Sequence, residues 1–130
     1  MIAWIAVLII VALLAYIRLA PSDTARWHVP TAVREDKTFK SGAVRIVDRG
    51  PHTLQTLMKT ALHTERTTQL AGSVEAGLIT FITRSKWLGF PDYTTIQLDS
   101  AQVILHARLR FGKSDLGVNK LRLQRWISKL

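Results

Sequence analysis

Two segments of this chain combine basic side chains with a turn rich in Gly, Ser and Asp, the residue types that bind anions. They cover residues 83–93 and residues 108–119. The second leads into a basic amphipathic segment, and a helix that begins there would present free N–H groups to an anion. Phosphate or carboxylate is the ligand class that this combination predicts. The basic side chains that we expect to bind the anion or an acidic partner are Arg84, Lys86, Arg108, Arg110 and Lys113.

Turn chemistry accounts for the same residues without a ligand. Ser114 or Asp115 would cap the helix, the glycines would supply positive φ, and the arginines would lie on the solvated side of a strand. A third possibility is that both turns line one cleft of a hydrolase or small-ligand binder, which requires the turns to converge. The residues of that cleft would be Ser85, Asp92, Ser114, Asp115 and Asn119.

Several well-known catalytic and metal sites are not found in the sequence. Residues 112–114 (GKS) resemble the end of a phosphate-binding loop, but Ala107 stands where that motif requires Gly. The four histidines lack metal-ligand spacing, and the absence of Cys excludes disulfides and thiolate chemistry. We therefore expect no metal, no cofactor and no catalytic residue, and a binding protein is favoured over an enzyme.

An apolar N-terminal run, residues 1–20, must position everything that follows it. Its first seventeen residues carry no charge, Pro or Gly, so no face of a helix there suits water. At about 1.5 Å per residue the run spans roughly 30 Å, one hydrocarbon core. Trp4 and Tyr16 suit the two interfaces. No basic residue precedes the run, and RLAP at residues 18–21 is a poor cleavage site, which favours a permanent single-pass anchor over a signal peptide.

The net charge of +9 lies entirely outside this run. A positive field on a small domain favours polyanions, namely acidic lipid headgroups, an acidic protein surface or nucleic acid. A membrane anchor makes nucleic acid the least expected of the three.

Beyond the anchor, the patterns predict a linker over residues 21–42 and one α+β domain over residues 43–130. Residues 43–48 alternate as a strand, with Val44 and Ile46 expected inward and Arg45 and Val47 outward. An apolar stripe at helical spacing then predicts a helix formed by Leu54, Leu57, Met58, Ala61 and Leu62.

The rest of the domain is predicted to be a run of strands closed by a second helix. Strands are expected over residues 67–75, 78–84, 93–98 and 102–111, with Gly77 at a hairpin turn, and a helix over residues 116–130. The order is β-α-β-β-β-β-α. Sequential hairpins without crossover helices predict a small antiparallel sheet with both helices packed on it.

The two turn segments also resemble the signature of a known family. SKWLGFPDYTTIQL, from Ser85, and RLRFGKSDLGVNKLRLQRW, from Arg108, are similar to the two motif blocks of the bacterial family called domain of unknown function 1499. The similarity covers most of residues 40–130, and RLAPSDTARWHV looks like a short membrane-anchored subgroup. It implies a shared fold and no established activity. The turn positions that carry it are Ser85, Gly89, Phe90, Asp92, Gly112, Ser114, Asp115, Leu116, Gly117 and Asn119.

Charge and resemblance predict different sides of the membrane for the domain. Arg18 and Arg26 follow the anchor, so the positive-inside rule favours the cytoplasm. The family implies the exterior, because many members carry export signals and cysteines suited to an oxidising compartment, although this chain has no cysteine. Since long domains translocate largely regardless of nearby charge, we expect a bacterial inner-membrane protein with a periplasmic domain; a cytoplasmic domain is the alternative.

Three functions stay open at this point. The first is a membrane-tethered accessory or binding domain whose basic face binds lipid headgroups or an acidic protein. The second is an envelope enzyme or small-ligand binder that uses the Ser/Asp turns. The third is a small subunit that packs beside a larger membrane complex.

Overall fold

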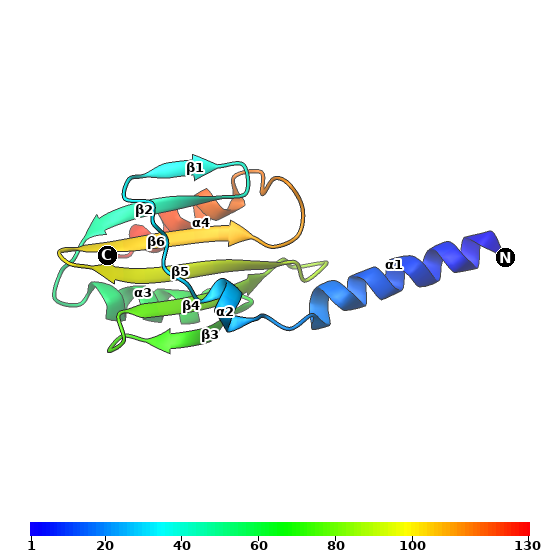
Figure 1. Cartoon of the computed structure of the whole chain (residues 1–130), viewed down its shortest axis with the longest axis horizontal. Coiled ribbons are helices and arrows are strands. Elements are labelled where there is room, and N and C mark those ends of the chain that lie inside the picture. Colours follow the sequence, from blue (N-terminus) through cyan, green and yellow to red (C-terminus); the bar gives the residue numbers. More distant parts are fainter.

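The apolar run forms one continuous helix, α1 (Ile2–Leu19), in the computed structural model, which describes all residues, 1–130. The helix projects from one end of the domain (Figure 1), and none of its residues is buried. It is long and apolar enough to span a membrane. A helix satisfies its own backbone hydrogen bonds, and every side chain of α1 before Arg18 is uncharged.

Six antiparallel strands form a single sheet in the order β1-β2-β6-β5-β4-β3. The last four strands are a meander, and β6 returns to pair with β2, which places Ala43 opposite Ala107. The strands are β1 (Lys37–Phe39), β2 (Gly42–Asp48), β3 (Thr67–Ser73), β4 (Leu78–Arg84), β5 (Pro91–Asp99) and β6 (Gln102–Leu109).

Helices α3 (Thr53–Leu62) and α4 (Val118–Ile127) pack on one face of the sheet. The core between them contains Leu57, Leu105 and Leu123, all fully buried. The rings of Phe81 and Trp126 meet edge to face with centroids 5.9 Å apart. The predicted α+β class and element order are therefore confirmed; the short α2 and β1 are additions.

Strand β2 faces the opposite way from the prediction. Ala43 and Val47 pack against the helices, whereas Val44 lies on the other face, paired with His106. The prediction that Val47 points outward was wrong. Val44, on the opposite face of the strand, is also fully buried, so both faces of β2 carry buried apolar residues. When both faces of a sheet are covered, alternation alone does not identify the face that meets the helices.

Residues 21–34, here called the strap, cover that second face. They include the short helix α2 (Thr24–Trp27), whose Trp27 ring stacks on Tyr93 at 4.1 Å and 10°. Farther along, the Thr31 N–H donates to the Gln97 side chain at 2.8 Å, and Arg34 pairs with Asp99 at 3.0 Å. The stretch expected to be an extended linker is therefore packed along the sheet, and its last part contributes β1.

Candidate functional site

A pocket of about 950 Å³ opens on the helical side of the sheet, between α3 and α4 and near the end from which α1 projects. The strand ends of β4, β5 and β6 form its floor. Both sequence motifs reach it, so the two turns converge as the cleft hypothesis requires. They contribute Ser85, Phe90 and Asp92 from the first turn and Gly112, Ser114 and Asp115 from the second.

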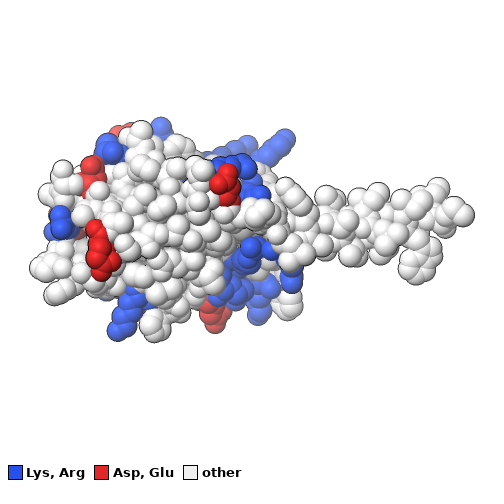
Figure 2. Space-filling view, turned by 60° about the horizontal axis from the view of Figure 1, so that its bottom comes forward, with Lys and Arg blue, Asp and Glu red and all other residues white.

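The lining carries more positive than negative charge. Asp92 lies 3.5 Å from Arg122, and Glu65 lies 3.0 Å from Arg66. The remaining cations have no carboxylate within ion-pair distance. Figure 2 shows Lys and Arg atoms gathered around the end of the domain where the projecting helix joins it. The six basic residues of the lining are Lys59, Arg66, Arg84, Arg122, Arg125 and Lys129, and the three acidic residues are Glu65, Asp92 and Asp115.

One wall of the pocket is a buried polar cluster centred on Arg122, which is 7% exposed. Its guanidinium donates to the Asp92 carboxylate and to the Asn119 side-chain oxygen. Burial raises the pKa of Asp92, and Arg122 opposes that rise. Burial likewise lowers the pKa of Arg122, and Asp92 opposes it. The pair therefore joins β5 to α4 with its charges largely cancelled.

Asp115 occupies the position where an anion was expected to bind. Its carboxylate accepts the N–H of Gly117 at 2.9 Å and the N–H of Asn119 at 3.2 Å, which caps the first turn of α4. Leu116 and Gly117 have φ of 53° and 81°. The Gly-Lys-Ser-Asp-Leu-Gly motif is thus explained by capping and left-handed backbone, and the free cations of the pocket lie elsewhere.

Both motif serines close their own turns. The Ser85 hydroxyl accepts the Phe90 N–H at 2.9 Å, and the Ser114 hydroxyl accepts the Leu116 N–H at 3.3 Å. Arg84 supports the first turn by donating to the Gly89 carbonyl at 3.0 Å. No hydrogen bond links either serine to a histidine, lysine or carboxylate, so the geometry of a nucleophile with its base is not formed.

Of the five cations predicted to bind an anion, only Arg84 lines the pocket. Arg108 and Arg110 lie under the strap on the other face. Arg108 donates to the Trp27 carbonyl and to Thr95, and Arg110 donates to the Pro21 carbonyl at 3.0 Å. Burial lowers the pKa of Arg108 to about 10.

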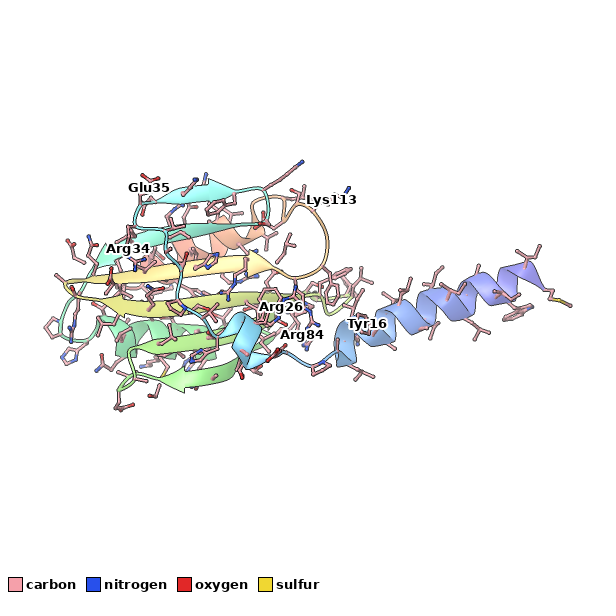
Figure 3. The ribbon with its side chains drawn as sticks, in the orientation of Figure 1. Tyr16, Arg26, Arg34, Glu35, Arg84 and Lys113 are labelled. Atoms are coloured by element: carbon pink, nitrogen blue, oxygen red, sulfur yellow. The ribbon has the colours of Figure 1, made fainter.

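The other two predicted cations, Lys86 and Lys113, are exposed on loops and do not line the pocket. Figure 3 shows Lys113 at the edge of the domain. Together with the arginines under the strap, they show that the predicted basic set does not form one surface.

Most of the basic pocket residues that were not predicted lie on the helices, and Arg66 lies between α3 and β3. Lys59, in the last turn of α3, and the basic residues of α4 lie outside the two turn segments from which the basic site was predicted. Arg122, Arg125 and Lys129 are spaced i, i+3, i+7, which places them on one side of the helix. That spacing predicts that the three side chains share one side of the helix, but it does not show whether that side lines a pocket or is a solvent-exposed surface.

The C-terminal end of α1, here called its foot, contacts the β4–β5 turn, which also lines the pocket. Arg18 donates to the Trp87 carbonyl at 2.7 Å and lies 3.4 Å from the Leu88 carbonyl. Tyr16 meets Phe111, a pocket residue, edge to face at 6.0 Å. Figure 3 shows Tyr16 and Arg84 together at this junction. The pocket therefore begins where the apolar helix ends.

Comparison with known proteins identifies one family. No curated protein and no solved structure matches this chain. A family described as "Protein of unknown function (DUF1499)" matches residues 19–130, a range that includes the strap, the whole sheet, both packed helices and both pocket turns. The resemblance of the two motif blocks is thereby confirmed: the chain belongs to the DUF1499 family.

Proposed function

We propose that this chain is a membrane-tethered binding domain whose pocket takes a ligand with a phosphate or carboxylate group. The observation that carries the proposal is the excess of unpaired cations at a concave site. Lys59, Arg125 and Lys129 line the pocket without an ion-pair partner. Charge-assisted hydrogen bonds to an anion are strongest where water is partly excluded.

The shape and the apolar wall of the pocket favour an amphiphilic ligand. Its volume of about 950 Å³ lies at the upper end of the roughly 300–1,000 Å³ usual for small-molecule sites. Phe90 and Phe111 supply partly exposed aromatic surface beside the cations. A concave site of this kind suits a lipid headgroup or a small organic anion better than the flat surface of an acidic protein.

Short-chain lipids test this proposal on the full chain in a non-ionic detergent. Isothermal titration with dihexanoyl phosphatidic acid should show saturable binding that weakens as salt is added. Inorganic phosphate distinguishes the source of the anion: binding of both probes indicates recognition of the phosphate alone, and binding of the lipid only indicates an amphiphile. Equal binding of dihexanoylglycerol, which has the same chains and no phosphate, would contradict the proposal.

A charge-matched pair of variants tests whether the pocket is the binding site. Arg125→Gln with Lys129→Gln should weaken binding by about tenfold or more, since each charged hydrogen bond contributes about 1.5–3 kcal/mol. Lys37→Gln with Lys120→Gln removes the same charge at exposed residues that do not line the pocket. That control should change the affinity less than twofold.

The proposal includes retention of α1 as a single-pass anchor of a bacterial inner membrane, with the domain in the periplasm. The hydrogen bonds of Arg18 to the β4–β5 turn support retention, because cleavage before the domain would remove them. A reporter fused after Leu130 tests the side. Alkaline phosphatase, which matures outside the cytoplasm, should be active there; activity of only a cytoplasmic reporter would place the domain inside.

A further inference from the structure

The β4–β5 turn carries large apolar side chains that the domain leaves exposed. Trp87 is 78% exposed and Leu88 is 43% exposed. Leu116, in the β6–α4 loop at the same end of the sheet, is 89% exposed. Exposed apolar residues are common singly, but here they gather at the end that bears α1.

The end of α1 sets the level of a bilayer relative to this turn. In a helix that spans the membrane, as proposed above, the first charged residue lies among the headgroups, and here that residue is Arg18. Its guanidinium bonds to the carbonyls of Trp87 and Leu88. The turn is therefore within one side-chain length of the headgroup level.

The side chains at this level have the chemistry of an interfacial anchor. Trp is enriched at the membrane–water interface because its ring is apolar and its N–H is polar. Lys86 stands with its ammonium 5.1 Å from the Trp87 ring centre, and Lys113 is exposed on the adjacent loop. Basic residues beside apolar ones are attracted to anionic headgroups.

We infer that Trp87, Leu88 and Leu116 insert into the interface of the bilayer that α1 spans, as a second contact between domain and membrane. The inference rests on the proposed spanning role of α1. The strap fixes the domain relative to α1, so the turn has one orientation toward the lipid. The pocket, which shares this turn, then opens at headgroup level.

Spin labels test the inference directly, because the chain contains no cysteine of its own. Single substitutions Leu88→Cys and Leu116→Cys are labelled in the full chain, in vesicles of phosphatidylcholine with phosphatidylglycerol. Val11→Cys, in the middle of α1, and Ala76→Cys, in the β3–β4 turn at the far end, are the two references.

Collision with oxygen and with a water-soluble nickel complex reports depth. Labels at 88 and 116 should collide several-fold more with oxygen than with nickel, as at 11, and the label at 76 should show the reverse. If the labels at 88 and 116 collide mainly with nickel, as at 76, while the label at 11 collides mainly with oxygen, the interfacial contact is overturned and the anchor is not. A label at 11 in water would overturn both. Shielding of 88 from both reagents would mean that a protein covers the turn, which also overturns the inference.

Discussion

At the residue scale, Arg122 connects the two motif turns of the family. Its side chain is 8% exposed and that of its partner Asp92 is 16% exposed. A buried ion pair adds little net stability, but removal of one partner leaves a charge that water can no longer reach. The family positions Asp92 and Asn119 are thus held by a residue outside the recognised turns.

Replacement of Arg122 should reveal this dependence. Arg122→Met should lower the free energy of unfolding by about 3 kcal/mol, because Asp92 keeps its burial and loses its cation. Addition of Asp92→Asn should recover part of the loss, since the two side chains share one interaction. Urea unfolding in detergent measures Arg122→Met, Asp92→Asn and the double variant; strictly additive losses would contradict the coupling.

His106 gives the fold a pH dependence. Burial, together with Arg108, lowers its pKa to about 4 in the folded chain, against 6.5 when unfolded. The unfolded chain then binds more protons between these values, so stability falls as the pH drops from 6.5 toward 4, by about 2–3 kcal/mol. The raised pKa of Asp92 makes the fold more stable as the pH drops, which opposes the effect of His106. The effect of His106 is therefore isolated by comparing the pH dependence of stability in wild type and in His106→Gln. Unfolding free energies at pH 7 and pH 4.5 should differ less in the variant.

At the element scale, local patterns predict helices and hairpins well and predict surfaces poorly. The stripe of α3 and the turn at Gly77 are local, and the structure contains both. The strap is held by hydrogen bonds to sheet side chains such as Gln97 and Arg108, and it is not a strand of the sheet. It therefore needs no alternation of apolar residues and tolerates its two prolines. Contacts between residues about 70 positions apart leave no local pattern, so neither the strap nor the pocket wall could be predicted.

Loss of the Trp27 ring should release the strap. Trp27→Ala removes a side chain that is 8% exposed and stacked on Tyr93, so it should cost about 3 kcal/mol or more. Hydrogen exchange should accelerate in residues 22–34 more than in α3. Leu121→Ala is the control, because that side chain is 55% exposed and should change stability by less than about 0.5 kcal/mol. Uniform acceleration across the domain would contradict a separately held strap.

At the scale of the whole molecule, α1, strap and domain form one connected body. The foot of α1 bonds to the β4–β5 turn, and the strap is fixed to β5 and β6 by Tyr93, Arg108 and Arg110. If α1 spans a membrane as proposed, this connection sets the direction in which the pocket faces as well as its distance from the membrane.

Gly89 tests that connection. Its φ is +72°, and a Cβ there would lie 3.0 Å from Cγ of Arg18. Gly89→Ala should cost about 1–2 kcal/mol from left-handed backbone and should also speed hydrogen exchange in residues 18–22. Gly112→Ala is the matched control, because its φ is also positive (+101°) and nothing lies within 4 Å of the added carbon. It should lose similar stability without faster exchange at the foot of α1.

The position of the strap has a consequence for the order in which the chain matures. Pro21 and Ser22 leave the ribosome early, yet their partners Arg110 and Tyr93 are 89 and 71 residues later. In the proposed anchor, the apolar helix can enter the bilayer while these partners are still being synthesised. The strap therefore stays without its partners until β5 and β6 are complete. Attachment of the helix to the domain is then among the last steps of biogenesis, and a truncated chain would reach the membrane without acquiring a fixed orientation.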